Sequence, residues 1–225
     1  MVTPWTRVGL LLVVLSVVVA ATGCAAPKYR LPYPEGAPRV GDAAGIAVVL
    51  EPTRDDRSDK TLDAILEKAA ADEISAILAR EIGGLPGVGS VVLGSAEPPS
   101  GPHLVVTPLV RRLAWEIPGY DRMAATALVV GVVSGGLGAL VYGATPTDVH
   151  GHATLAVAVR AVPASGDRVL EKEYAVTANE RMAKLKSDLP STKAEMAARA
   201  LQQVIEQFKA DLSALVSTAR VSRGP

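Results

Sequence analysis

The sequence predicts an α+β domain, in which a mainly antiparallel sheet of about five strands carries two long amphipathic helices on one face and a glycine-rich hydrophobic insertion. Three observations lead to this prediction. Short apolar or alternating runs bounded by Gly, Pro and Asp recur from residue 45 to residue 177, as is typical of strands. Residues 61–82 and 192–215 repeat apolar side chains at intervals of three and four, the period of an amphipathic helix. One uncharged stretch, 123–143, interrupts this order.

The domain is predicted to begin at residue 45 with a strand and a helix. Residues 46–50 are a short apolar run closed by Pro52, as expected of a buried strand. A helix is predicted over residues 61–82, with Gly83-Gly84 as its C-terminal stop. Its apolar stripe consists of Leu62, Ile65, Leu66, Ala69, Ala70, Ile74, Ile77, Leu78 and Ile82.

Four more strands are predicted, at 88–93, 104–117, 154–162 and 168–177. The last two alternate with period two around the turn Pro163-Ala164-Ser165-Gly166-Asp167, so they are predicted to form an antiparallel hairpin. In the strand 104–117, Pro108 indicates an edge or a bulge. The side chains expected to share one side of that strand are Leu109, Leu113, Trp115 and Ile117. The inward rows expected for the hairpin are Leu155, Val157 and Val159, opposite Leu170, Tyr174 and Val176.

The last predicted element is a second amphipathic helix. Thr192 and Glu195 have the spacing of a capping box. The stripe consists of Ala197, Leu201, Val204, Phe208, Leu212 and Leu215. A partner helix could bind it, but packing on the sheet is the favoured interpretation. The domain is thus predicted to span 45–219, followed by a disordered tail at 220–225.

The N-terminus carries a pattern of basic, apolar and small residues that ends at the chain's one cysteine. Arg7 precedes an apolar run, and Ala21-Thr22-Gly23 place small residues before Cys24. This resembles the lipobox of bacterial lipoproteins, with Ala21 in place of the usual Leu. The resemblance implies cleavage between Gly23 and Cys24, which removes the signal peptide 1–23 and leaves a diacylglycerol and an N-acyl lipid on Cys24. An uncleaved anchor is the alternative, but the run is shorter than the about 20 residues of a membrane span.

The two residues directly after Cys24 indicate at which membrane the predicted lipoprotein is held. Ala25-Ala26 lack the Asp that retains such lipoproteins at the inner membrane, so the resemblance implies a lipid-anchored protein of the cell envelope at the outer membrane. Residues 24–44 are rich in proline and predict an extended, lipid-anchored tether. Tyr29 and Tyr33 could lie at the lipid headgroups, although solvated side chains are the favoured interpretation.

Composition excludes several classes of function. Removal of residues 1–23 takes away Arg7 and leaves 22 of the 23 basic residues and all 23 acidic ones, a net charge of −1. Nucleic acid is therefore not an expected partner. With Cys24 lipidated, no cysteine is left for a disulfide or a zinc cluster. Aromatic residues are 4% of the chain, which predicts a core of Val, Leu, Ile and Ala.

The uncharged stretch 123–143 has the length of a membrane span. Small residues recur in it at intervals of four, the pattern that lets helices approach closely in lipid. The residues predicted to contact membrane or other subunits are Ala127, Gly131, Gly135, Ala139 and Gly143.

The topology of this stretch is left open by the sequence. A single crossing would split the predicted sheet between two sides of a membrane. A helical hairpin dipping into lipid, or a β-hairpin paired with strands of other subunits, keeps both flanks together. Burial in the domain or in a soluble oligomer is the remaining alternative. Valine favours a strand and the spacing of four favours a helix.

No catalytic motif stands out, and we predict neither an enzyme nor a cofactor nor a metal site. His150 and His152, with Asp148, are the strongest metal-binding candidate, but a polar entry into a strand explains them better. Glu171 and Glu173 share a strand face, which we interpret as solvated.

The lipobox at Cys24 and the element order from Ile46 to Val216 together resemble small α/β envelope lipoproteins, namely transport-auxiliary lipoproteins and, more distantly, the curli-secretion type. The resemblance implies a non-enzymatic structural, transport or assembly accessory role, in contact with membrane lipid and with an envelope protein or further copies of the chain. The alternative is a periplasm-facing soluble binding or scaffold module with residues 123–143 buried in its core.

Overall fold

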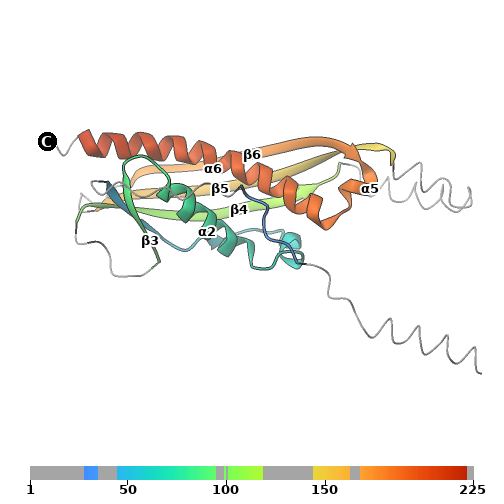
Figure 1. The fold of residues 1–225 in the computed structure, drawn as a ribbon, viewed down its shortest axis with the longest axis horizontal. Helices are drawn as coiled ribbons and strands as arrows, with labels where there is room; N and C mark the ends of the chain where they lie inside the picture. Colours follow the sequence, from blue (N-terminus) through green and yellow to red (C-terminus); the bar gives the residue numbers. More distant parts are fainter. Residues whose placement is uncertain are drawn as a thin grey trace, which may run out of the picture.

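A computed structural model describes residues 28–34, 45–94, 99, 101–118, 144–162 and 168–221, which form a sheet layer and a helix layer (Figure 1). The elements are β1 (Ile46–Leu50), β2 (Arg54–Asp55), the 3-10 helix η1 (Thr61–Ala64), α2 (Ala70–Gly83), β3 (Val88–Leu93), β4 (His103–Glu116), β5 (Pro146–Val162), β6 (Arg168–Ala183), α5 (Lys184–Ser187) and α6 (Pro190–Val221).

The sheet has the strand order β3-β1-β4-β5-β6, and β2 pairs with β4 beyond the end of β1. The long strands β4, β5 and β6 pair antiparallel. β1 pairs parallel with β3, because α2 carries the chain from β1 back to the start of β3. β1 and β2 also pair parallel with β4. The predicted α+β class and the mostly antiparallel sheet are therefore confirmed.

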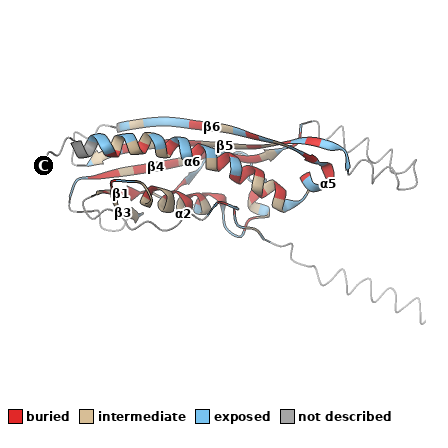
Figure 2. Ribbon diagram, turned by 45° about the horizontal axis from the view of Figure 1, so that its top comes forward, coloured by how far each residue is buried: buried red, intermediate tan, exposed pale blue. Residues whose placement is uncertain are grey.

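Both helices lie on one face of the sheet and enclose a single core. The amine of Lys209 in α6 donates a hydrogen bond to Glu81 in α2, at 2.8 Å. Figure 2 shows buried and exposed residues alternating along α6. The predicted stripe is confirmed, since Ala197, Leu201, Val204, Phe208 and Leu212 are buried and Leu215 is partly buried. The stripe of α6 therefore packs on the sheet.

The short strands β1 and β3 agree with the sequence-based prediction, and β4 agrees to within one residue at each end. The strands β5 and β6 are longer than predicted. Residues 46–50 and 88–93 are β1 and β3 as predicted. The predicted hairpin is β5 and β6, with Leu155, Val157, Val159 and Tyr174 buried. However, β5 begins at Pro146 and β6 continues to Ala183. The added residues include Asp, Gly and Asn, which have low strand propensity, so pairing with neighbouring strands prevails over local preference here.

A β-bulge between Val110 and Arg112 divides β4. Val110 before the bulge and Leu113 after it are both buried under the helices. A bulge inserts one residue and so reverses the alternation of faces. The prediction that Leu109 shares a side with Leu113, Trp115 and Ile117 is therefore wrong for Leu109. Pro108 falls in the gap between the residues of β4 that pair with β1 and those that pair with β2.

The first helix is shorter than predicted. Residues 61–64 form η1, and α2 begins only at Ala70. Between them the backbone pairs with the N-terminal segment: the Tyr29 amide donates to Ile65 at 2.8 Å, and the Glu67 amide donates to Tyr29 at 2.8 Å. These bonds replace the helical ones that the apolar spacing had predicted.

The same segment, residues 28–34, packs against the domain and is not a free tether over this length. Leu31 and Tyr33 are buried. The Arg80 guanidinium lies 5.4 Å from the centre of the Tyr33 ring, and Arg80 also donates to the carbonyl of Pro34. Burial raises the pKa of Tyr33. The prediction that the Tyr33 side chain is solvated is therefore wrong.

Helix α6 begins two residues before the predicted cap. Pro190 is its first residue, a position where a missing amide hydrogen loses no bond. Thr192 is buried inside the first turn, so the predicted capping box is wrong.

Helix α6 approaches the sheet closely at Gly151 in β5. A Cβ atom built on Gly151 would lie 1.9 Å from the carbonyl oxygen of Met196 in α6. Only a residue without a side chain fits between β5 and α6 at this point.

Candidate functional site

No helix of the described chain covers the other face of the sheet, which we call the open face. Its centre is made by small side chains of β5, Thr154, Ala156 and Ala158, which alternate with the buried residues of the same strand. The paired residues Thr107 and Leu109 of β4 flank them on one side, and Glu171 and Glu173 of β6 on the other. Small residues between longer ones form a trough along β5.

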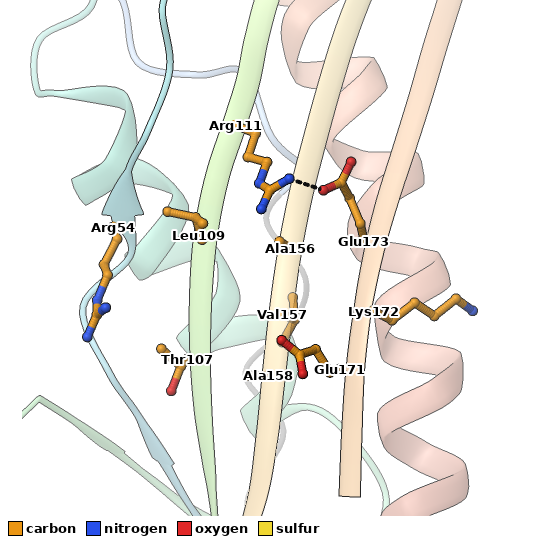
Figure 3. A pocket seen from close by; sticks show the side chains of 10 residues that line it. All are labelled: Arg54, Thr107, Leu109, Arg111, Ala156, Val157, Ala158, Glu171, Lys172 and Glu173. Carbon is orange, nitrogen blue, oxygen red and sulfur yellow. Dashed lines mark ion pairs between the residues drawn. The ribbon is translucent and has the colours of Figure 1, made fainter. Parts of the chain in front are cut away.

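This trough contains a depression of about 350 Å³. Arg111 and Glu173 form an ion pair across it at 2.8 Å (Figure 3). The Lys172 side chain points away from it and binds Asp211 of α6 at 2.8 Å. The lining residues are Arg54, Thr107, Leu109, Arg111, Ala156, Val157, Ala158, Glu171, Lys172 and Glu173. The predicted interpretation of Glu171 and Glu173 as solvated agrees with their exposure, and Glu173 in addition has an arginine partner.

A second depression of about 420 Å³ adjoins the first at Arg111. It is lined by Arg57, Ser58, Asp59, Arg111, Arg112, Ala114, Trp115 and Glu116. Both depressions are partly open to solvent and are lined by residues of both charges. Such a surface suits a polar segment of another protein better than a small apolar molecule, which needs an enclosed pocket.

The structure places His150 and His152 side by side at the start of β5, where His150 pairs with Glu116 of β4. The rings of His150 and His152 pack edge to face at 6.1 Å between centroids. His152 contacts Glu116 at 3.2 Å and Thr177 at 3.0 Å, and burial, followed by the charge of Arg112, lowers its pKa. His103 lies at the other end of β4. Among residues 28–34, 45–94, 99, 101–118, 144–162 and 168–221, no group of three His, Cys, Asp or Glu is placed to hold a metal ion.

The structure contains a buried arginine, Arg57, that the sequence did not predict. The Arg57 side chain is 1% exposed and binds two carboxylates, Asp55 of β2 and Asp63 of η1, each with a shortest distance of 2.9 Å. Asp63 also accepts a hydrogen bond from the amide of Ala70, the first residue of α2. This cluster ties β2 to the start of α2. The charged stretch 51–60 indicated only a loop, since no local pattern reveals a partner outside it.

Acid is expected to weaken the domain through this cluster. The hydrogen bond from Arg57 lowers the pKa of Asp55 from 3.8 to about 2. Because the folded pKa is lowered, the stabilisation is present above pH 4 and is lost as the pH falls towards 2; it amounts to about 1–2 kcal/mol. Urea unfolding at pH 5 and pH 2.5 measures it. Asp55→Asn should lower stability at pH 5 and reduce the pH dependence; an unchanged pH dependence would exclude Asp55 as its source.

One end of the sheet brings together the segments that flank the predicted contact regions. The end of β4 pairs with the start of β5, with Glu116 opposite His150, so the chain leaves after Pro118 and returns at Ala144 on the same side. The amide of Lys184 at the start of α5 donates to the carbonyl of Thr145 at 3.0 Å. In Figure 1 this end, which we call the α5 end, lies to the right.

The described N-terminus lies toward the same end. The amine of Lys28 donates to the carbonyl of Ala64 in η1. Residues 57–59, just before η1, line a depression together with residues 111, 112 and 114–116 in the last part of β4. Three residues separate Lys28 from Cys24. Cys24 and the insertion 123–143 thus join the described chain toward the same end.

The predicted contact residues themselves are outside the described residues. These are Gly23 and Cys24 at the predicted cleavage point, and Ala127, Gly131, Gly135, Ala139 and Gly143 in the insertion. None of the helices in the described ranges has the length and hydropathy needed to cross a membrane.

No protein-family model and no curated protein matches the chain. Some solved structures are similar in fold. A neuraminyllactose-binding hemagglutinin homologue from Helicobacter pylori is 12% identical with a TM-score of 0.44, over 87% of this chain and 95% of that one. The hypothetical protein CT253 from Chlamydia trachomatis is 10% identical with a TM-score of 0.40, over 74% and 96%. The PelC dodecamer from Paraburkholderia phytofirmans is 14% identical with a TM-score of 0.32, over 72% and 89%. These similarities concern the arrangement of strands and helices and identify no site residue.

Proposed function

We propose that the protein is a lipid-anchored, non-enzymatic component of the bacterial cell envelope, with an accessory role in structure, transport or assembly. Its lipid is carried by Cys24, and its insertion 123–143 contacts the membrane or partner subunits. The proposed location is the outer membrane.

The observation that carries this proposal is the shared end of the domain. A lipid on Cys24 needs the N-terminus to face the membrane, and Lys28 lies beside η1, toward the α5 end. Pro118 and Ala144, which flank the insertion, lie at the α5 end. Both apolar segments can therefore reach one lipid surface while the folded domain stays in water. A single crossing by the insertion would instead require β4 and β5, which pair along their length, to stand on opposite sides of a membrane.

The open face supports a partner-binding role for the domain. The face combines small side chains on β5 with the charges of Arg111, Arg112 and Glu171 around them. This composition is typical of a polar contact surface. The opposite face of the sheet is already covered by α2 and α6. A domain held at a membrane by one end keeps this face accessible to an envelope protein or to another copy.

The first experiment tests the lipid anchor. The full chain expressed in a bacterial host should appear in the membrane fraction and carry a mass increase for three acyl chains on a peptide that begins at residue 24. Cys24→Ala should remove the modification completely, because the thiol is the attachment point. A matched control, Ala26→Ser, should be acylated like the wild type. An unmodified wild-type chain would contradict the proposal.

The second experiment tests the insertion. Residues 24–225 carrying Cys24→Ala are mixed with liposomes, with residues 123–143 present or replaced by a short Gly-Ser linker, and flotation is measured. Flotation that depends on the insertion supports membrane contact. If both forms remain in solution but only the intact form assembles into oligomers, the insertion contacts partner subunits. If neither occurs and replacement unfolds the domain, residues 123–143 belong to the core and that part of the proposal is wrong.

A further inference from the structure

We propose that the α5 end carries a second, peripheral contact with an anionic lipid surface, made by Leu185 and Leu189 together with the basic residues around them. This inference rests on the proposed lipid anchor at Cys24. It adds an orienting contact, which holds the domain end-on to the membrane.

Two exposed leucines stand out in the segment from β6 to α6. Leu185 is 72% exposed and Leu189 is 48% exposed, four residues apart on either side of the turn that ends α5. Neither contributes to the core. Large apolar side chains exposed in one short segment are typical of contact surfaces, and leucine is well suited to insertion at a lipid interface.

The charges around these leucines favour an anionic surface. Residues 181–193 contain Arg181, Lys184, Lys186 and Lys193 against Asp188 alone, a net charge of +3. Lys184 is buried and lies 3.9 Å from Asp188, so the basic rim consists of Arg181, Lys186 and Lys193. Arg181 and Lys186 are exposed. The amine of Lys193 lies 4.0 Å above the ring of Trp115, which is partly buried near the end of β4. Apolar side chains within a basic rim have the composition of interfacial membrane contacts.

The position of the segment selects lipid over a soluble partner. The amide of Lys184 is hydrogen-bonded to Thr145, one residue from the point where the insertion rejoins the described chain. The N-terminal segment that leads to Cys24 also leaves the domain toward this end. An acyl chain on Cys24 would therefore hold Leu185 and Leu189 near the headgroups, where little additional free energy is needed to insert them.

The test uses the acylated full-length protein reconstituted into vesicles. Cys24 is the only cysteine and its thiol is consumed by lipid, so Leu185→Cys introduces a single site for an environment-sensitive fluorophore. Leu93→Cys is the matched control, because Leu93 is 54% exposed but lies at the level of Val106, far along β4 from Glu116. On vesicles of phosphatidylcholine with phosphatidylglycerol, the label at 185 should shift to the blue and be quenched by spin-labelled lipid. The label at 93 should remain in water.

Two further variants separate charge from apolar contact. Lys186→Glu should reduce the lipid-contacting fraction of the label at 185 by about fivefold or more on anionic vesicles, and less on pure phosphatidylcholine. Leu189→Ser should reduce it on both. A label at 185 that behaves like the label at 93 on anchored protein would overturn the inference. A blue shift that depends on protein concentration without vesicles would overturn it in favour of a contact between copies. A chain that is never acylated would be missing from the vesicles altogether, which identifies failure of the anchor itself.

Discussion

Gly151→Ala is expected to lower the free energy of unfolding by more than about 3 kcal/mol, although it adds only a methyl group. The new Cβ would lie 1.9 Å from the carbonyl oxygen and 2.4 Å from the carbonyl carbon of Met196. These are backbone atoms of α6, so no change of side-chain rotamer relieves the overlap. The helix would have to move away from β5 and lose contacts along its buried stripe.

Urea unfolding followed by circular dichroism measures this effect. Gly101→Ala is the matched control, because a Cβ at Gly101 meets no atom within 4 Å, and its effect should stay within about 0.5 kcal/mol. A Gly151→Ala protein as stable as the control would show that α6 does not approach β5 as closely as the structure has it.

Phe208→Ala is expected to lower the free energy of unfolding by about 3–5 kcal/mol. Phe208 is the only phenylalanine in the chain, is 0% exposed and packs at 67° against the ring of Tyr174, with 6.0 Å between centroids. The substitution leaves a cavity between α6 and β6 in a core built mostly of aliphatic side chains. The backbone of β6 beside this cavity is fixed by its pairing with β5, so the strand cannot move in to fill the space.

The same unfolding measurement tests this prediction, with Phe208→Leu as the control that retains most of the volume and should lose about 1 kcal/mol. Tyr174 gives a second readout. Its hydroxyl donates to Asp211 at 2.7 Å, and burial raises its pKa. Phe208→Ala should open this site to water and move the pKa of Tyr174 back towards its ordinary value. Equal stability of the two variants would contradict the proposed core role of the ring.

The sequence predicted the fold well where the pattern is local. β1, β3 and the buried stripe of α6 are set by short apolar runs and by helical periodicity, which depend on neighbours in the sequence alone. The errors arise where distant contacts decide. The bulge in β4 reverses the faces of the strand, and residues 28–34 occupy the backbone groups of residues 65–67. Neither the bulge nor the contact of residues 28–34 with residues 65–67 can be identified from a local sequence pattern.

The candidate surfaces also divide into those that a local sequence pattern predicts and those that depend on distant contacts. The lipobox and the small residues of the insertion are sequence patterns, and Cys24 and Ala127 to Gly143 remain predictions. The trough on the open face, the buried Arg57 cluster and the α5 end depend on which strands are neighbours. Leu185 and Leu189 lie in a short Lys-rich turn whose exposure becomes evident only once β6 and α6 are placed.

The pairing of Glu116 with His150 also determines how freely the chain can vary between β4 and β5. The sheet holds the two ends of this connection side by side whatever joins them, and doubling the length of a flexible connection costs only about 0.6 kcal/mol in loop entropy. If the insertion contacts lipid or partner subunits as proposed, then insertions, deletions and wholesale changes of composition between residues 118 and 144 should be tolerated by folding. Related chains are expected to diverge most in this connection, so that one scaffold can be adapted to different surroundings while its core stays the same.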